Sequence, residues 1–208
     1  PDSIFFKPNN SIKKLLNQIK TYGWDTFIIK PNGGTTANGF RKFVLNDCLN
    51  DTSLINDYIK ENNSFKEFII QLFVKGFDKY GEIKMIWINN EFSYAINIKR
   101  KDFSGKNEDV VFVKDKKVLE ECKKIGQEAI DLFPPIFVNR KKVNPVLVRT
   151  DFACCLDDDD KKKKYFLNEV ENQCAHTYSD KKGITYPFME VIADNFVKKA
   201  QELVKLGF

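Results

Sequence analysis

Hydrophobic and polar positions follow two different periods along the chain, and each change of period marks an expected structural element. Apolar residues recur every three to four positions in several segments, which is the spacing of one helix face. We therefore predict helices over residues 11–22, 51–60, 117–132 and 187–206. Ser11 is placed to cap the first helix, and Gly23 is placed to end it.

Short apolar or alternating runs between these helices indicate strands. We expect strands over residues 26–29, 40–45, 67–74, 83–88, 92–98, 146–152 and 165–171. The turn Asn89-Asn90-Glu91 is typical of a hairpin. Because strands and helices do not alternate as βαβ repeats, we do not expect a Rossmann-type parallel sheet. The predicted fold class is α+β with antiparallel sheets.

Composition narrows the class of protein. The chain has 208 residues, 42% of them hydrophobic, and its nineteen Phe argue against disorder. A net charge of +5 is too mild to indicate nucleic acid as a partner. No apolar run approaches the ~18 residues that cross a bilayer, so no membrane partner is expected. Five cysteines without a CxxC pair favour reduced thiols and a cytoplasmic location.

The strongest candidate chemistry lies in two strand segments, Arg149-Thr150-Asp151 and Glu169-Val170-Glu171. Alternate residues of a strand share a face, so a pairing of these strands would gather three carboxylates and one guanidinium on one surface. Carboxylate oxygens are the ligands that Mg²⁺ prefers, and an arginine can hold a phosphate beside the metal. The alternative is an exposed strand face whose charges pair with one another.

Two upstream segments carry weaker signals. Lys30 ends an apolar strand, and Pro31 and a Gly-rich loop over residues 32–39 follow it. A cation beside accessible backbone N–H groups suits phosphate, although an ordinary turn is an alternative. The apolar run 68–74 precedes a polar crossover and can place backbone groups against an adenine edge, or it can be a plain core strand.

Taken in sequence order, these segments resemble the ATP-grasp superfamily, and most closely its glutathione-synthetase-like branch. The similarity spans nearly the whole chain. It comprises an early lysine, a Lys-Pro before a Gly-rich loop, an adenine-binding linker, a Gly-acidic-x-basic element, an R-x-D strand and an E-x-[NE] strand. The matching positions are, in that order, Lys13; Lys30-Pro31 with Gly33 and Gly34; Gln71-Leu72-Phe73-Val74; Gly81-Glu82-Ile83-Lys84 with Lys99 and Arg100; Arg149-Thr150-Asp151; and Glu169-Val170-Glu171.

The resemblance implies an ATP-grasp fold in which two α/β subdomains with antiparallel sheets enclose an ATP cleft. Residues 1–75 would form the smaller subdomain and residues 76–208 the larger. The implied ATP-binding residues are Lys13, Lys30, Gly33 and Gly34 for the phosphates, and Gln71, Leu72, Phe73 and Val74 for adenine. The implied catalytic residues near the γ-phosphate or an acyl phosphate are Lys84, Lys99 and Arg149. The implied Mg²⁺ ligands are Asp151, Glu169 and Glu171.

The implied function is an ATP-dependent ligase that joins a small-molecule carboxylate to an amine or a thiol through an acyl phosphate. One alternative is an ATP-grasp small-molecule kinase of the inositol-phosphate type. A phosphorylated substrate would suit the basic set Lys99, Arg100, Lys101 and Lys106. A non-catalytic binding module is the other alternative. The oligomeric state stays open.

Three features depart from the family pattern. The Gly-rich loop carries Thr35, Thr36 and Ala37 where relatives often have Gly. The run Asp157 to Lys164 resembles an insertion at a hairpin tip, and a solvated tip is the expected reading. No N-terminal substrate domain is expected before the ATP-grasp core, because Pro1 begins almost at that core; the chain is either a fragment or a minimal version.

Overall fold

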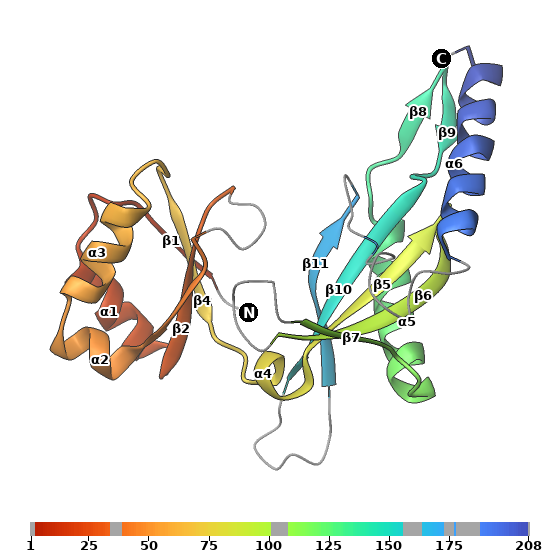
Figure 1. Cartoon of the computed structure of the whole chain (residues 1–208). Coiled ribbons are helices and arrows are strands. Elements are labelled where there is room, and N and C mark those ends of the chain that lie inside the picture. The colour runs from red at the N-terminus through yellow and green to blue at the C-terminus, as the bar shows by residue number, and fades with distance from the viewer. Residues whose placement is uncertain are drawn as a thin grey trace. The chain divides into compact units, whose positions relative to one another are not determined.

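The structure is a computed structural model that describes residues 3–33, 39–100, 108–155, 164–172, 177 and 188–207. The chain divides into two compact units, Pro1–Phe73 and Val74–Phe208. Each unit has an antiparallel sheet of its own (Figure 1). Among the described helices, none combines the length and the apolar character that crossing a membrane requires.

The first unit is a four-stranded sheet of order β1-β4-β2-β3 with three helices on one face. The strands are β1 (Ser3–Phe6), β2 (Thr26–Pro31), β3 (Arg41–Val44) and β4 (Phe68–Leu72). The helices are α1 (Ile12–Thr21), α2 (Leu45–Asn50) and α3 (Ser53–Glu61). Alternate residues of the central strands, such as Phe27 and Ile70, pack with Leu16, Ile19 and Tyr58 from the helices to form a single core.

The second unit is built on a five-stranded sheet of order β11-β10-β5-β6-β7. Its strands are β5 (Glu82–Ile88), β6 (Glu91–Arg100), β7 (Glu108–Phe112), β10 (Leu147–Cys155) and β11 (Lys164–Glu171). A separate hairpin consists of β8 (Ile136–Val138) and β9 (Lys141–Val143). The helices are α4 (Gly76–Tyr80), α5 (Lys116–Asp131) and α6 (Phe188–Lys205).

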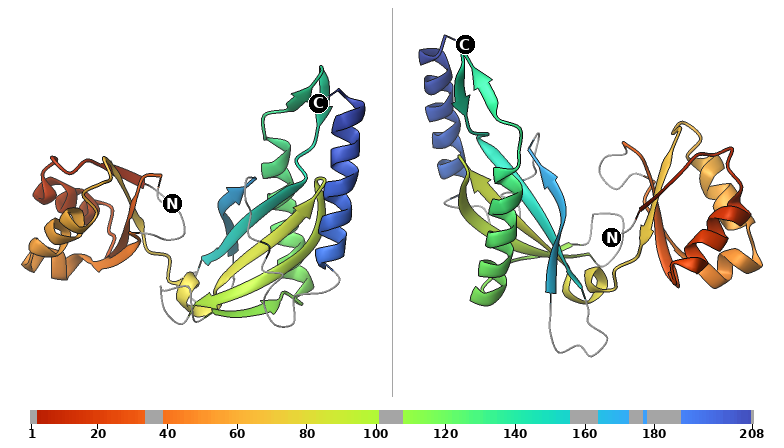
Figure 2. Two further views of the ribbon diagram at one scale, coloured as in Figure 1. Left: turned by 45° about the horizontal axis from the view of Figure 1, so that its top comes forward. Right: turned by 180° about the vertical axis from the view of Figure 1, so that it is seen from behind.

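The two long helices of the second unit lie on opposite faces of its sheet (Figure 2). Helix α5 covers one face, where Cys122 and Ile130 pack with Met85 and Phe152. Helix α6 packs through Ile192 against the apolar part of the other face, which belongs to β5 and β6. On the α6 face, the part of the sheet formed by β10 and β11 can therefore carry polar side chains.

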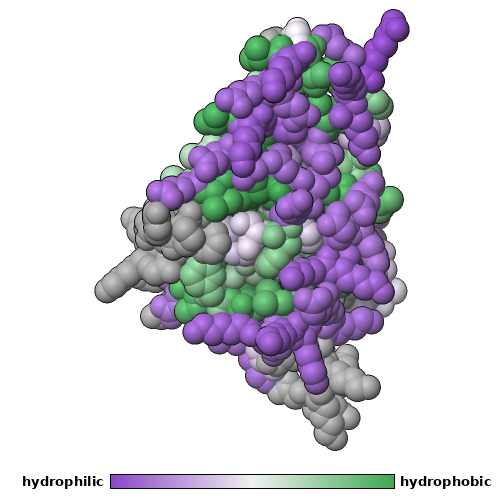
Figure 3. Space-filling model, turned by 90° about the vertical axis from the view of Figure 1, so that its right-hand side faces the viewer, coloured by the Kyte–Doolittle hydropathy of each residue, from purple (hydrophilic) through white to green (hydrophobic). Residues whose placement is uncertain are grey.

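The exposed surface of α6 carries several apolar residues among charged ones. Met189, Phe196, Val197 and Val204 are all exposed. Figure 3, which looks onto this side of the molecule, shows hydrophobic residues in green among the hydrophilic ones. Helix α6 thus carries apolar residues on more than the side that packs.

The periodicity of the sequence located most of these elements correctly. The four predicted helices correspond to α1, α3, α5 and α6, and the predicted strands correspond to β2, β3, β4, β5, β6, β10 and β11. Ser11 caps α1 as expected, because the backbone N–H of Lys14 donates to its Oγ at 3.4 Å. In the predicted hairpin, Asn89 and Asn90 have φ angles of 52° and 67°, which a tight two-residue turn demands.

Short elements and edge strands were missed. Strands β1, β7, β8 and β9 and helices α2 and α4 were not predicted. Each has between three and six residues, which is too few to display a period. The predicted strand 40–45 ends early, since Leu45 begins α2. Residues 101–107, and most of the run Asp157 to Lys164, lie outside the described residues.

Gly126 allows α5 to approach the sheet closely. A Cβ atom at this position would lie 2.7 Å from Cζ2 of Trp87 and 3.1 Å from Oγ1 of Thr150. The Trp87 indole cannot easily move, because it is buried and its Nε1–H donates to Thr150 Oγ1 at 2.8 Å. A side chain at position 126 would therefore push the helix away from its own core.

We expect Gly126→Ala to reduce the free energy of unfolding, by up to about 2 kcal/mol. Overpacking costs about 1–3 kcal/mol, whereas Ala is favoured over Gly in a helix by only about 1 kcal/mol. Urea unfolding would measure the difference, with Glu128→Ala on the exposed side of α5 as the control. A Gly126→Ala protein more stable than the natural one would show that the close approach is absent.

Candidate metal and phosphate site

Strand β10 lies at the centre of the candidate site and is unusual in being buried along nearly its whole length. Residues 148–154 are all buried, although they include Arg149 and Asp151. The strand pairs with β11 on one side and with β5 on the other, both antiparallel. A charged residue on β10 therefore has neighbours from two strands and hardly any water.

The strand register gathers the charged residues. Arg149 lies opposite Glu171, and Asp151 lies opposite Glu169. On the other side, Asp151 lies opposite Lys84. Directly opposed residues of antiparallel strands project to the same face, so these side chains converge. The structure thus brings together five of the residues singled out from the sequence.

A β-bulge adds a further residue to this face. The register between β10 and β11 shifts after Asp151, because Asp151 pairs with Glu169 whereas Phe152 pairs with Leu167. Asn168 is therefore the extra residue of β11. Its Nδ2 donates to Oε1 of Glu82 at 3.2 Å, which places Asn168 on the same face as the carboxylates. Bulges beside functional sites commonly redirect side chains in this way.

Asp151 has no solvent exposure, and two cations compensate its charge. Arg149 donates from Nε to Oδ1 at 2.7 Å and from Nη2 to Oδ2 at 2.8 Å. Lys84 donates from Nζ to Oδ2 as well. Both cations are themselves buried, with exposed fractions of 4% for Arg149 and 3% for Lys84. Pairing of this kind is what makes buried charge tolerable.

The two cations also contact the outer carboxylates. Arg149 Nη2 lies 2.7 Å from Oε1 of Glu171, and Lys84 Nζ lies 2.9 Å from Oε2 of Glu82. The described cluster holds two positive groups, Lys84 and Arg149. It holds four carboxylates: Glu82, Asp151, Glu169 and Glu171. With all groups ionised, the net charge of the cluster is 2 − 4 = −2. One bound divalent cation would neutralise this charge.

The spacing of three carboxylates fits a metal ion. Asp151, Glu169 and Glu171 each offer one oxygen, and these oxygens all lie within 4.8 Å of one another. Mg²⁺ binds oxygen at about 2.0–2.1 Å, so two ligands of one ion can be at most about 4.2 Å apart. If the carboxylate oxygens moved slightly closer together, they could therefore bind one magnesium ion. Asp151 is buried, Glu171 is partly buried and Glu169 is exposed, so phosphate or water can supply the other ligands from the exposed side.

The most exposed carboxylate of the three, Glu169, is harder to ionise than an ordinary glutamate. The pKa of Glu169 is raised, first because protein atoms around it displace water, and then because Asp151 and Glu171 lie nearby. Lys84 and Arg149 oppose this shift without cancelling it. The Glu169 side chain is exposed, and solvent screens its interactions, so the pKa shift has only a moderate effect on stability. A bound cation would relieve the repulsion.

Lys99 lies on the other face of the same sheet. Ile98, its neighbour on β6, belongs to the α6 face together with Ile86 and Ile96. Strand alternation turns Lys99 to the α5 face, where it lines a hollow of about 300 Å³ with Ile83 and Tyr165. The structure therefore does not bring Lys99 to the carboxylates.

In the first unit, Lys30 and Gln71 share the face that no described helix covers. Ile28 pairs with Gln71 and Lys30 pairs with Ile69, whereas Phe27 and Ile29 turn to the helices. Gln71 donates from Nε2 to Oγ of Ser3 at 2.7 Å. The two residues therefore lie on one surface, as a shared ligand would require.

The remaining predicted nucleotide-binding residues of the first unit are distributed differently. Lys13 is exposed on α1, in the helical layer, so the structure does not bring it to the face that carries Lys30. Gly33 has φ of +82° and no heavy atom within 4 Å of its Cβ position, which keeps the backbone there accessible. Gly34 lies outside the described residues.

The predicted adenine linker crosses the boundary between the units. Leu72 ends β4 and is exposed, Phe73 is buried, and Val74 begins the second unit. The Lys42 ammonium lies 3.7 Å from the centroid of the Phe73 ring. Phe73 is therefore held as part of the first unit's packing.

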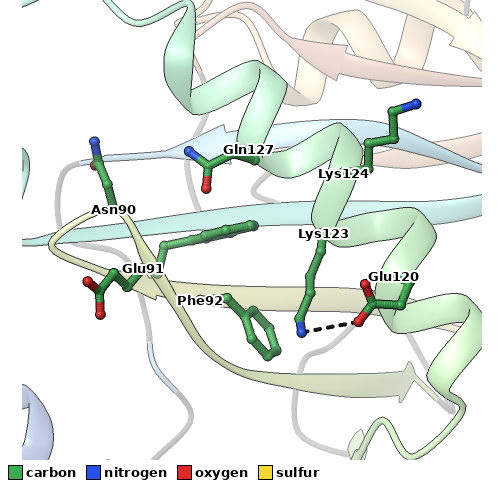
Figure 4. A pocket seen from close by; sticks show the side chains of 8 residues that line it. Asn90, Glu91, Phe92, Glu120, Lys123, Lys124 and Gln127 are labelled. Atoms are coloured by element: carbon green, nitrogen blue, oxygen red, sulfur yellow. Dashed lines mark hydrogen bonds and ion pairs between the residues drawn. The ribbon is translucent and has the colours of Figure 1, made fainter.

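A second hollow, of about 510 Å³, lies on the α5 face and away from the carboxylates (Figure 4). It is wide open and is lined by Asn90 and Phe92 from the β5–β6 hairpin and by Lys123 and Gln127 from α5. Lys123 lies over the Phe92 ring at 4.4 Å and pairs with Glu120 at 3.4 Å. Lys123 therefore has partners, and the hollow lacks the convergent charge of the carboxylate cluster.

The architecture matches that of solved ATP-grasp ligases. The D-alanine–D-alanine ligase from Bacillus anthracis, solved with ATP, has a TM-score of 0.63 at 15% identity, over 100% of this chain and 62% of that one. D-cycloserine synthetase DcsG has a TM-score of 0.62 at 11% identity, over 95% of this chain and 64% of that one. The ATP-grasp ligase PsnB, solved with a precursor variant, Mg and ADP, has 0.57 at 14%, over 96% and 53%.

These similarities show that the chain has the ATP-grasp fold, as the order of motifs predicted. They extend over less than two thirds of the length of each of those proteins, at 62%, 64% and 53%. The sequence matches no family model and no curated protein. The fold is therefore established by three-dimensional similarity rather than by sequence identity.

Two members of the cluster were not identified as site residues from the sequence. Glu82 was part of the quoted Gly-acidic-x-basic element, and alternation with Lys84 would have placed both on one face. Asn168 gave no such signal, because in a regular strand it would face away from Glu169. Only the bulge brings it to the site.

We expect Glu169→Gln to raise the melting temperature of the metal-free protein at pH 7. The raised pKa means that ionised Glu169 costs stability above its folded-state pKa; this cost shrinks as the pH falls through that value and is gone below the unfolded-state pKa. Thermal unfolding in EDTA would measure the difference, with the exposed Glu128→Gln as control. The gap between Glu169→Gln and the natural protein should narrow towards pH 4.5. A Glu169→Gln protein that is less stable at pH 7 would contradict the raised pKa of Glu169.

Proposed function

We propose that this chain carries the ATP-binding and catalytic part of an ATP-dependent ligase that joins a small-molecule carboxylate to an amine or a thiol. One observation carries the proposal, namely the convergence of Asp151, Glu169 and Glu171 with two buried cations on one sheet face of an ATP-grasp fold. Two of the solved proteins of similar fold are ligases by name and the third is a synthetase, which supports this class of reaction.

In this proposal the three carboxylates hold Mg²⁺, which supplies positive charge to the phosphates of ATP. Arg149 and Lys84, next to the carboxylates, bind and orient the γ-phosphate and neutralise the charge that spreads over it during transfer. In the first unit, Lys30 and Gly33, together with Gly34, bind phosphate, and Gln71 to Val74 hold adenine. Lys30 and Gln71 are supported by their common face.

The reaction needs no nucleophilic side chain. An oxygen of the substrate carboxylate attacks the γ-phosphorus, the bond to the β-phosphate oxygen breaks, and ADP leaves. The amine or thiol then attacks the carbonyl carbon of the acyl phosphate and loses a proton, and inorganic phosphate leaves. The protein contributes position and charge, which is the main source of catalysis in phosphoryl transfer.

The kinase alternative is not favoured by the described residues. It drew on a basic set around Lys99, and Lys99 lies on the α5 face of the sheet, opposite the carboxylates. Lys101 and Lys106 lie outside the described residues. The ligase is therefore the function that we carry forward.

We expect a non-hydrolysable ATP analogue with Mg²⁺ to stabilise the protein against thermal unfolding. At a ligand concentration 100 times the Kd, binding adds about 2.7 kcal/mol to the free energy of unfolding. The double variant Glu169→Gln/Glu171→Gln should lose most of this gain, whereas Glu120→Gln/Glu128→Gln on α5 should retain it. An equal shift in all three proteins, or no shift in the natural one, would contradict the site.

We expect hydroxylamine to trap a hydroxamate when the protein is given ATP, Mg²⁺ and a set of small carboxylic acids, since an acyl phosphate reacts with hydroxylamine at its carbonyl carbon. Release of ADP should depend on the acid that yields the hydroxamate. Colorimetry with ferric ion and mass spectrometry would identify the product. A phosphorylated alcohol without hydroxamate would indicate a kinase instead.

A further inference from the structure

Lys84 takes a position at the carboxylates that a bound cation would compete for. Its ammonium lies against Oδ2 of Asp151 and 2.9 Å from Oε2 of Glu82. Oδ2 also accepts a hydrogen bond from Nη2 of Arg149 at 2.8 Å. A carboxylate oxygen has two lone pairs, so both lone pairs of Oδ2 are already engaged by cations. A metal ion that used this oxygen would have to displace one of them.

Lys84 is the cation that can give way more readily. Arg149 holds Asp151 by two hydrogen bonds in a planar fork, from the same strand. Lys84 reaches Asp151 as a single ammonium on a flexible stem from the neighbouring strand. Displacing Lys84 therefore breaks one contact with Asp151, whereas displacing Arg149 breaks two.

Glu82 provides an acceptor for Lys84 away from Asp151. It lies two residues earlier on β5 and projects to the same face. Its Oε1 accepts from Asn168 at 3.2 Å, and this bond leaves Oε2 turned towards Lys84. The side chain of Glu82 has an exposed fraction of only 13%, so its position is set by the protein rather than by solvent. The β-bulge that places Asn168 thereby also fixes the second partner of Lys84.

We propose that Lys84 is the built-in counter-ion of the metal site: it neutralises Asp151 in the metal-free protein and competes with a divalent cation for that carboxylate, while Glu82 holds the ammonium when the cation binds. This inference rests on the proposed magnesium site and concerns its regulation. Glu82 acts through Lys84 and is a positioning residue. The ammonium thus keeps a carboxylate partner in both states and stays beside the carboxylates.

Opposite effects of two substitutions follow. Lys84→Met removes the competitor and should tighten the binding of a divalent cation about thirtyfold, because even in water the repulsion between an ammonium and a divalent ion about 4 Å apart has this size. Of the two carboxylates that Lys84 contacts, Glu82→Gln leaves only Asp151 charged. The ammonium then competes more strongly with the divalent cation for Asp151, so binding of the cation should weaken several-fold. If Lys84 only stabilised the strands, its removal would weaken binding instead.

The test is a titration of the full chain with Mn²⁺ alone, without nucleotide, followed by electron paramagnetic resonance of the free ion. Mn²⁺ favours the same oxygen ligands as Mg²⁺. The matched control is Lys124→Met, which removes an equal charge from the exposed side of α5 and should leave the affinity unchanged. Circular dichroism would verify that each variant is folded. If Lys84→Met fails to fold, Glu82→Gln alone decides, and an unchanged or tighter affinity in it overturns the inference.

The double variant Lys84→Met/Glu82→Gln separates a direct from an indirect role of Glu82. If Glu82 acts through Lys84, Glu82→Gln should weaken Mn²⁺ binding less when Lys84 is absent than when it is present. An equal effect in both backgrounds would overturn the positioning role of Glu82.

The outcomes distinguish this inference from the proposed function. If the natural protein binds Mn²⁺ and Glu169→Gln/Glu171→Gln does not, the metal site stands. Unchanged or weaker binding by folded Lys84→Met then overturns the counter-ion inference alone. If the natural protein binds no Mn²⁺, the proposed metal site fails and the inference fails with it.

Discussion

The pairing of Asp151 inside the central sheet of the second unit is the interaction on which the candidate site depends. An ionised carboxylate without solvent exposure is tolerated only when cations and hydrogen bonds replace water. Arg149 supplies one cation from the same strand, and Lys84 supplies another from the strand beside it. A slip of one residue in the register between β10 and β5 would turn Lys84 to the opposite face from Asp151. The charge of Asp151 and the register of the sheet therefore constrain each other.

The cluster is neutralised only in its interior. The exposure of the carboxylates increases from Asp151 on β10 to Glu171 and then Glu169 on the outer strand β11. Two cations face four carboxylates, and the neighbouring Asp151 and Glu171 add to the rise in the pKa of Glu169 that its partial burial causes. An ordinary surface pair such as Arg41 and Glu61, at 2.6 Å, balances one charge with one. The excess of negative charge therefore distinguishes this cluster from an ordinary surface salt bridge, and it suits the proposed cation site.

In both units, polar residues of the candidate site lie on the sheet face opposite one that helices cover. In the first unit α1, α2 and α3 cover one face, and Lys30 and Gln71 lie on the other. In the second unit α5 covers one face so closely that Gly126 has no space for a side chain, and the carboxylates lie on the other face. A sheet that packs closely against a helical layer on one face can hold its backbone rigidly while part of its other face carries charged groups, which suits a site that must keep its geometry.

The sequence by itself determined the local features of this protein. Apolar spacing located the long helices and the central strands, and alternation placed Arg149 with Asp151 and Glu169 with Glu171, because both properties depend on residues close together in the chain. The tertiary structure alone decided the rest. Lys84 and Asp151 are 67 positions apart and meet only through strand pairing. The bulge at Asn168, the turn of Lys99 to the α5 face and the edge strands β1 and β7 also depend on which distant backbone a strand pairs with. Strand pairing is a non-local choice, and a local period carries no record of it.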